Sequence, residues 1–247
     1  MKFAIFGDIH ANLEALEAVL ADAAEHDCSH HVCIGDIVGY NANPRECLEL
    51  VRSLECPVVK GNHDEEASLD TDLIGLNPLA EQSMKWTREQ LTNEDKEYLS
   101  DLKLVRQVRD FTIVHATLDT PPGWGYVTSK FDALASFSYQ YTPLCFFGHT
   151  HTPVFYSKSL SVEVEDGLKV EIEQGKKYFT NVGSVGQPRD GDPRSCYVVY
   201  DENVVEFRRV EYEVERTVRE INAQPDLDEY LEFDVKDFGK NTYHIFE

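Results

Sequence analysis

The stretch KFAIFGDIHAN, residues 2–12, decides the fold of this chain. Residues 2–7 form a short apolar run typical of a buried β-strand, and the run ends at Asp8 and His10. Residues 11–26 carry apolar side chains at helical spacing and predict an α-helix. Because ligands bind at the carboxyl ends of strands in α/β sheets, the stretch predicts a β-α unit with a site where its strand ends.

Four more polar motifs follow along the chain, most of them after short apolar runs. They are Gly35-Asp36, Gly61-Asn62-His63-Asp64, His115 and Gly148-His149-Thr150-His151. A strand at residues 31–34, a helix from Pro44 and a strand at Val58 and Val59 complete two β-α-β units. Such units predict a mostly parallel sheet, whose neighbouring strands end at one edge. We therefore expect the Asp, Asn and His side chains of all five motifs to converge.

The second half of the chain is expected to be richer in antiparallel strands. Residues 66–102 are helical in character, and Thr92 with Asp95 resembles a capping box. Strands are then expected at residues 104–109, 111–115, 144–148, 153–157, 161–165, 168–173, 178–182, 196–200 and 203–210. The predicted fold class is α/β, with this β layer packed against the first half.

The length and the placement of the motifs indicate one domain. The 247 residues suffice for a full buried core, and the motifs follow one another without a linker-like break. We expect a single domain over residues 1–247, with an acidic C-terminal extension at about 212–247 that packs on it or trails from it. One or two surface helices are expected within residues 212–233, and the last fourteen residues give no clear signal.

The composition limits the classes of partner and compartment. The formal net charge is −22, and a surface this acidic repels phosphate backbones, so long nucleic acid is not an expected partner. No stretch approaches the ~20 apolar residues of a membrane span, and residues 1–14 turn polar too soon for a signal peptide. The six scattered cysteines favour reduced thiols. We expect a cytoplasmic protein, and the sequence gives no signal for its oligomeric state.

The polar motifs contain seven candidate metal ligands. These are Asp8, His10, Asp36, Asn62, His115, His149 and His151. Seven donors exceed what one tetrahedral zinc ion binds, so two divalent ions are expected. Mixed oxygen and nitrogen donors suit manganese, iron or zinc. Two such ions outweigh the two carboxylates and a bridging hydroxide in charge, so the site would attract a small phosphorylated substrate.

These motifs in this order resemble the signature of the calcineurin-like metallophosphoesterases, from residue 2 to about residue 200. Three longer strings resemble a small bacterial and archaeal branch described as diadenosine tetraphosphatase-like or as phosphodiesterases. They are GDIVGYNANP, WTREQLTNED and NVGSVGQPRDGDPRSCY. The resemblance implies a four-layer α-β-β-α sandwich of two mixed sheets, with a dinuclear site at its top edge.

The resemblance also implies roles for single residues. The first metal would bind Asp8, His10, Asp36 and His151, and the second would bind Asp36, Asn62, His115 and His149. His63 would contact the phosphoryl oxygen and protonate the leaving group, and Asp64 would orient His63. The implied activity is hydrolysis of phosphodiester or phosphoanhydride bonds in small substrates, such as bis-nucleotides like diadenosine tetraphosphate, by a metal-bridging hydroxide.

Two positions depart from the family pattern. Gly39-Tyr40 stands where the protein Ser/Thr phosphatases carry an Asp-Arg pair, which argues against phosphoproteins as substrates. Ala116 follows His115 where a glycine is usual, and the extra methyl group is not expected to disable the site.

Five further residues are candidates for contacts with the substrate. Tyr40 and Asn41 form either a tight turn or part of the substrate wall. Arg189 is the best cation for gripping a distal phosphate, since a guanidinium fork fits phosphate oxygens, and the alternative is an exposed arginine among acidic residues. Trp124 and Tyr126 either stack on a base or pin their loop.

Three other functions compete with this hypothesis. A phosphomonoesterase would use the same residues. A non-catalytic scaffold on the same fold needs no ligands, whereas all seven are present together with His63. A nuclease would need a stripe of Lys and Arg, which this acidic chain lacks.

Overall fold

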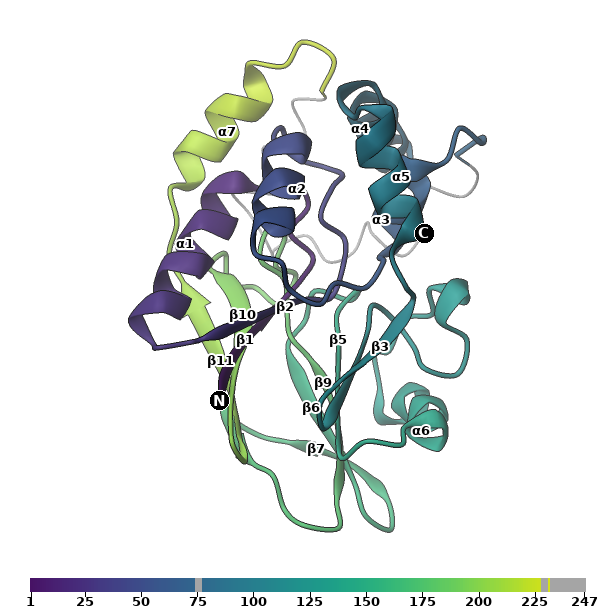
Figure 1. Ribbon diagram of the computed structural model, residues 1–247, viewed down its shortest axis with the longest axis vertical. Helices are drawn as coiled ribbons and strands as arrows, with labels where there is room; N and C mark the ends of the chain where they lie inside the picture. Colours follow the sequence, from purple (N-terminus) through teal and green to yellow (C-terminus); the bar gives the residue numbers. More distant parts are fainter. Residues whose placement is uncertain (74–76, 228–230, 232–247) are drawn as a thin grey trace.

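Two mixed β-sheets form the centre of this computed structural model, which describes residues 1–73, 77–227 and 231 (Figure 1). The first sheet has the strand order β2-β1-β10-β11-β8. Its strands are β1 (Lys2–Phe6), β2 (His30–Cys33), β8 (Lys169–Glu171), β10 (Ser195–Asp201) and β11 (Val204–Val210). β1 and β2 pair in parallel, and the other neighbours pair antiparallel.

The second sheet has the strand order β3-β4-β5-β9-β6-β7. Its strands are β3 (Val105–Val108), β4 (Phe111–Val114), β5 (Leu144–Phe147), β6 (Val154–Lys158), β7 (Val162–Glu165) and β9 (Lys177–Asn181). β5 pairs in parallel with β4 and β9, whereas the outer pairs are antiparallel. The first sheet thus has its parallel strands β1 and β2 at one edge, and the second has its parallel strands β4, β5 and β9 in the middle. The loops after β1, β2, β4 and β5 carry polar motifs.

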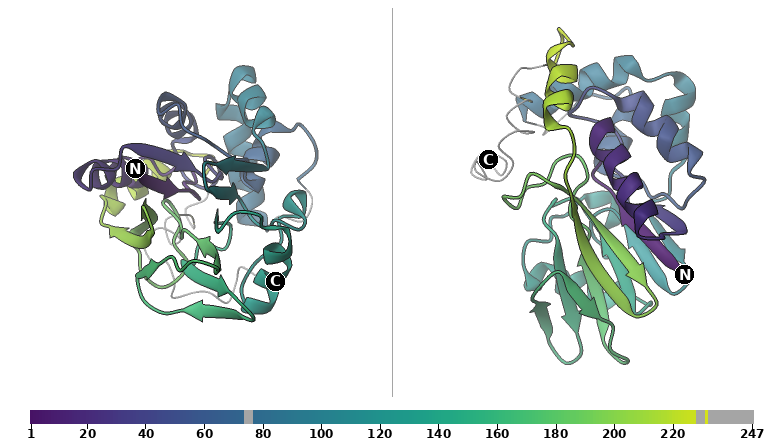
Figure 2. Two further views of the ribbon diagram at one scale, coloured as in Figure 1. Left: turned by 60° about the horizontal axis from the view of Figure 1, so that its bottom comes forward. Right: turned by 90° about the vertical axis from the view of Figure 1, so that its left-hand side faces the viewer.

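Helices lie outside both sheets, and Figure 2 shows the sheets as separate layers between them. The helices are α1 (Leu13–Glu25), α2 (Pro44–Ser53), α3 (Asn62–Ser68), α4 (Pro78–Gln90), α5 (Asn93–Asp101), α6 (Lys130–Tyr139) and α7 (Val214–Asn222), with a short 3-10 turn η1 (Pro121–Gly123). Figure 1 shows α1 and α2 beside the first sheet and α6 beside the second.

Alternating side chains explain this layering. In β1, Phe3 and Ile5 belong to a core between the sheets, whereas Phe6 packs among residues of α1 and α2. In β5, Phe146 belongs to the core between the sheets, whereas Phe147 packs with residues of α6. Successive strand residues point to opposite faces, so each strand contributes to two apolar layers. The α-β-β-α sandwich of two mixed sheets is therefore confirmed.

Two elements differ from the expectations. Val58 and Val59 form only isolated bridges, to Cys33 and Lys103, in place of a full strand. Helix α6 was not expected, although Ser129 opens it with a capping box that a search for Ser-x-x-Asp would have found. Because it covers the outer face of the second sheet, α6 supplies the fourth layer.

The first part of the C-terminal extension packs on the domain. Helix α7 contacts α1 (Figure 1), where Thr217 Oγ1 donates to Glu14 Oε2 at 2.9 Å and Arg216 Nε lies 3.1 Å from Glu14 Oε1. The rest of the extension, residues 228–230 and 232–247, lies outside the described residues. Among the described helices, none is long and apolar enough to cross a bilayer.

Candidate metal centre

The candidate ligands lie in loops at the carboxyl ends of strands from both sheets. Asp8 and His10 follow β1, Asp36 follows β2, His115 follows β4, and His149 and His151 follow β5. Asn62 is the first residue of α3 and is half-buried, whereas the other six are buried. The side chains therefore converge as predicted, but they come from the strand ends of two mixed sheets and not from one mostly parallel sheet.

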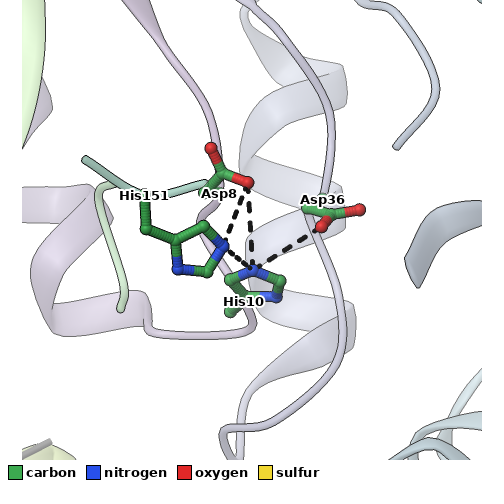
Figure 3. A group of neighbouring side chains, drawn as sticks. All are labelled: Asp8, His10, Asp36 and His151. Carbon is green, nitrogen blue, oxygen red and sulfur yellow. Dashed lines mark hydrogen bonds and ion pairs between the residues drawn. The ribbon is translucent and has the colours of Figure 1, made fainter. Parts of the chain in front are cut away.

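These side chains form two groups that share Asp36. The ligand atoms of each group lie within 4.8 Å of one another. The first group is Asp8, His10, Asp36 and His151, which face one another in Figure 3, and the second is Asp36, His115 and His149. Asn62 adjoins the second group, because its Oδ1 lies 3.2 Å from His115 Nε2.

Hydrogen bonds to backbone carbonyls determine how three of the imidazoles are protonated. In His10, His115 and His151, Nδ1 lies near the carbonyl oxygens of Val38 (3.3 Å), Ile34 (2.9 Å) and Gln187 (2.6 Å), respectively. A carbonyl only accepts, so Nδ1 must carry the proton. In the neutral rings, Nε2 then presents a lone pair to the cluster.

The lone pairs of these rings face other acceptors. Nε2 of His10 and Nε2 of His151 lie 3.0 Å apart, and Nε2 of His151 lies 3.3 Å from Asp8 Oδ1. His149 has the opposite tautomer, because its Nε2 donates to the carbonyl of Trp124 at 2.9 Å and leaves Nδ1 as the acceptor. Acceptors that face one another in a buried site are stabilised by a cation between them, and metal-ligating histidines are oriented in this way.

The pKa shifts indicate that most of the candidate ligands are held without a positive charge of their own. Burial raises the pKa of Asp8 and lowers the pKa of His10 and His151. Burial opposes ionisation of His115 too, but the carboxylate of Asp36 raises the pKa of His115 to about 9. The remaining rings are neutral at pH 7, so the residues fit divalent cations that accept both oxygen and nitrogen ligands.

Backbone strain is concentrated at this cluster. Five of the seven candidate ligands have positive φ angles, namely Asp8 (49°), His10 (48°), Asp36 (50°), His149 (67°) and His151 (58°). Left-handed backbone is uncommon for residues with a side chain and costs on the order of 1 kcal/mol or more each. Folding elsewhere in the protein must offset this cost, as is common where side chains are held for function.

Two glycines allow the carboxylates to come close to neighbouring loops. A Cβ atom at Gly61 would lie 2.0 Å from Asp36 Oδ1, and one at Gly148 would lie 2.2 Å from Asp8 Oδ2. Any other residue would therefore displace a candidate ligand. This explains why glycine stands in two of the polar motifs.

Asp64 does not hold His63, contrary to the role implied by the resemblance. Its carboxylate accepts the backbone N–H groups of Asp36 (2.8 Å), Ile37 (2.9 Å) and Gly61 (3.0 Å). Within the described part of the chain, Nδ1 of His63 is buried without a hydrogen-bond partner. Asp64 thus ties the Asp36 loop to the start of α3, and three backbone donors already use its oxygens.

The ring of His63 lies against the first ligand group. Its centroid lies 4.8 Å from that of His10 and 4.7 Å from that of Tyr40, and its backbone N–H donates to Asp36 Oδ1 at 2.8 Å. Tyr40 has a φ of 65°, which fits the tight turn that the sequence allowed, and its ring packs against those of His10 and His63. Asn41 is buried and uses its Nδ2 to donate to the carbonyl of His10 at 2.7 Å, so it braces the His10 loop.

Arg189 lies next to the cluster and is half-buried. Burial lowers the pKa of His63, and the nearby guanidinium of Arg189 lowers it further. Nη2 of Arg189 donates to Gln187 Oε1 at 2.6 Å, while its Nε is buried without a partner among the described residues. The predicted phosphate-binding arginine is thus close to the site, with a donor that an anion would satisfy.

Some residues that hold the metal cluster in place are not indicated by the sequence motifs. The carbonyl of Gln187 orients His151, and Glu65 accepts from Trp124 Nε1 at 3.1 Å. The hydroxyl of Ser184 donates to the carbonyl of Asp8 at 2.8 Å. Backbone carbonyls leave no mark in a sequence, so of these three contacts only that between Glu65 and Trp124 joins two side chains.

Comparisons with known proteins agree with this site. The model of the calcineurin-like phosphoesterase superfamily domain matches residues 1–203. The uncharacterized protein MJ0912 of Methanocaldococcus jannaschii is 37% identical over 224 residues, which cover 88% of this chain and 90% of that protein.

Two solved structures share the fold. A metallophosphoesterase from Sphaerobacter thermophilus is 37% identical with a TM-score of 0.84, covering 96% of this chain and 98% of that one. The hypothetical protein PH1004 from Pyrococcus horikoshii OT3 is 19% identical with a TM-score of 0.79, covering 97% and 99%. The family match over most of the chain, joined to a buried Asp and His cluster suited to metal ions, shows that this protein belongs to the calcineurin-like phosphoesterase superfamily of phosphoric ester hydrolases.

Proposed function

We propose that this protein hydrolyses phosphodiester or phosphoanhydride bonds of small substrates at a dinuclear metal centre. The observation that carries the proposal is the position of Asp36, which belongs to both buried ligand groups. A carboxylate has two oxygens, so one residue can hold two ions at the ~3.5–4 Å spacing of two-metal sites. Bound ions would supply Lewis acidity toward a water molecule and toward the phosphoryl oxygens.

The two ligand groups define the proposed coordination. One ion would bind Asp8, His10, Asp36 and His151, and the other would bind Asp36, Asn62, His115 and His149. The mixture of carboxylate, amide and imidazole donors favours manganese, iron or zinc. The tautomers support this assignment, because each ring is held by its second nitrogen.

Two residues beside the cluster would act on the substrate. Arg189 would bind a phosphate oxygen through its half-buried guanidinium, whose fork of N–H donors fits phosphate oxygens. His63 is the proposed proton donor to the departing oxygen, since its ring lies against His10 beside the first ligand group. Gly39-Tyr40 replaces the pair found in the protein phosphatases, so small diesters and bis-nucleotides such as diadenosine tetraphosphate are the proposed substrates.

The test combines metal content with turnover. The wild type and Asp36→Asn would be purified with manganese, and Asp166→Asn, an exposed turn substitution, would serve as the matched control. The metals per chain would be measured by mass spectrometry, and hydrolysis would be measured on bis(p-nitrophenyl) phosphate, p-nitrophenyl phosphate and diadenosine tetraphosphate. We expect about two ions and diester turnover in the wild type and in Asp166→Asn, and loss of both in Asp36→Asn.

The outcomes separate the competing functions. Inactivity of the wild type on all three compounds with manganese, iron and zinc would contradict the proposal. A preference for p-nitrophenyl phosphate would instead indicate a phosphomonoesterase. A wild type that binds no metal would indicate the non-catalytic scaffold.

A further inference from the structure

The loop that contains Gly39 and Tyr40 packs against the ring of His63. The backbone at Gly39 comes so close that a Cβ atom there would lie 2.5 Å from His63 Nδ1, and the φ of 91° at this position suits glycine. The ring of Tyr40 packs on that of His63 with the two planes 40° apart. Because Nδ1 of His63 has no hydrogen-bond partner among the described residues, this loop is what holds that side of the ring in place.

Tyr40 belongs to an apolar cluster that extends into the C-terminal helix α7. Its backbone N–H donates to Ser83 Oγ of α4 at 2.6 Å. Its side chain shares the buried cluster with Trp86 of α4 and with Val218 and Ile221 of α7, which are 3% and 0% exposed. Helix α7 thus contributes to the core around Tyr40, although it lies beyond residue 203, where the match to the family domain ends.

Polar contacts fix α7 to the loop that follows β1. Thr217 Oγ1 lies 3.2 Å from Asn12 Oδ1, and Asn12 Nδ2 donates to the carbonyl of Gly186 at 3.2 Å and to the hydroxyl of Tyr212 at 3.4 Å. Asn12 is only two residues from His10 in the chain. Since buried polar groups lose stability when they lose their partners, these contacts oppose movement of α7 relative to the metal cluster.

We propose that Val218 and Ile221 of α7 are positioning residues for the reaction, because they hold Tyr40, and through it His63, in place beside the metal cluster. This inference rests on the proposed function, in which His63 donates a proton to the departing oxygen. A displacement of about 1 Å in a group that acts on the reacting atoms can cost about a hundredfold in rate. The C-terminal extension therefore influences turnover through the ring of Tyr40.

The first measurement follows the position of His63 without turnover. NMR of the zinc-supplied protein would record the imidazole proton resonances, with His63→Gln to assign those of His63. Val218→Ala removes two carbon atoms from the cluster around Tyr40, and Ile221→Val is a milder variant that removes one. The matched control is Val162→Ala, which removes the same two atoms from the buried cluster next to α6.

The His63 resonances should move in both α7 variants, because neighbouring side chains partly relax into the space that is left and the ring of Tyr40 moves with them. They should stay at their wild-type positions in Val162→Ala. Unmoved resonances in the folded α7 variants would overturn the inference, and so would an equal movement in the control.

The second measurement is a double-mutant cycle on kcat. Hydrolysis of bis(p-nitrophenyl) phosphate with manganese would be compared for Val218→Ala, Tyr40→Ala and the double variant. We expect kcat to fall about tenfold in Val218→Ala, with wild-type metal content, and about a hundredfold in Tyr40→Ala. In the Tyr40→Ala background, Val218→Ala should have no further effect, since the two residues act through one ring.

The outcomes distinguish positioning from general stability and from the proposed function. Independent effects that add in the double variant would overturn the inference, as would the same loss of kcat in Val162→Ala. An inactive wild type whose His63 resonances still move in the α7 variants would refute the proposed function alone.

Discussion

Acidic residues at two places next to the first sheet differ in the partners that surround them. On helix α1, Asp22 accepts Nη2 and Nε of Arg208 at 3.0 and 3.2 Å and the hydroxyl of Tyr197 at 2.7 Å. At the end of β1 and β2, Asp8 and Asp36 face imidazole nitrogens instead. The chain gives the first carboxylate an arginine, whereas among the described residues it gives the second pair imidazoles, of which His115 has a pKa raised to about 9.

The difference separates a carboxylate that is paired within the chain from carboxylates that are expected to bind metal ions. Arg208 and Tyr197 face each other in the β10–β11 register, so the sheet itself assembles the partners of Asp22. The imidazoles of His10 and His115 are instead turned by backbone carbonyls so that their Nε2 atoms point toward the carboxylates. A buried carboxylate without a cation is costly, so the cluster should depend on metal while the Asp22 network should not.

The largest expected effect comes from crowding the cluster. Gly61→Ala places a Cβ 2.0 Å from Asp36 Oδ1, and the backbone φ of −96° adds no strain of its own. Displacing one ligand by about 1 Å should lower kcat/KM by at least about a hundredfold, with loss of bound metal. Kinetics and metal analysis would check this, with circular dichroism confirming the fold. Full metal content in Gly61→Ala would contradict the prediction that the cluster holds metal through Asp36.

Removing the metal should be the next largest effect. A ligand at a hundred times its Kd stabilises a protein by about 2.7 kcal/mol, which is roughly 5–10 °C in Tm for a chain of this size. Chelation should therefore lower the Tm of the wild type by that amount. Asp36→Asn should show no such shift, whereas Asp22→Asn should show the full shift from a lower starting Tm. Equal responses of the two variants would contradict the prediction.

Substitutions of two arginines distinguish the Asp22 network from the metal cluster. Arg208→Ala removes the partner of Asp22 and should cost about 1–3 kcal/mol of stability, with KM unchanged. Arg189→Ala removes a guanidinium whose Nε lacks a partner among the described residues, so KM for diesters should rise about tenfold with little change in Tm. Steady-state kinetics and thermal denaturation on both variants would check this crossed pattern. Reversal of the two effects would show that Arg189 serves the fold.

The smallest expected effect is the pH response of the Asp22 network. Burial raises the pKa of Asp22, but hydrogen bonds from Arg208 and Tyr197 outweigh it, so the net pKa lies below the ordinary value of 3.8. The unfolded chain then takes up this proton more readily, so the stabilisation is present above that value and is lost as the pH falls below it. The Tm difference between the wild type and Asp22→Asn should shrink toward about pH 3. A constant difference across the acid range would argue that Asp22 is not ionised in the fold.

Much of the fold could be predicted, but some parts could not. The buried strands are short apolar runs bounded by polar residues, so β1 and β5 were expected close to where they lie. Val58 and Val59 have the same apolar character, yet they only bridge Cys33 and Lys103, because pairing depends on neighbours that are distant in sequence. Helix α6 has large apolar residues on both its exposed face (Phe131) and its buried face (Phe137), so its apolar spacing did not indicate a helix.

The residue types of the cluster could be found from the sequence alone, because six of the seven candidate ligands follow strands that their own neighbours predict, and Asn62 is the exception. Only the tertiary structure decided how those ligands are held and used. Asp64 binds three backbone N–H groups, Asn41 braces the His10 carbonyl, and Tyr126 stacks on His149. Residue type and strand position are local properties of the chain, whereas hydrogen-bond and stacking partners come from other loops and exist only after the two sheets have packed.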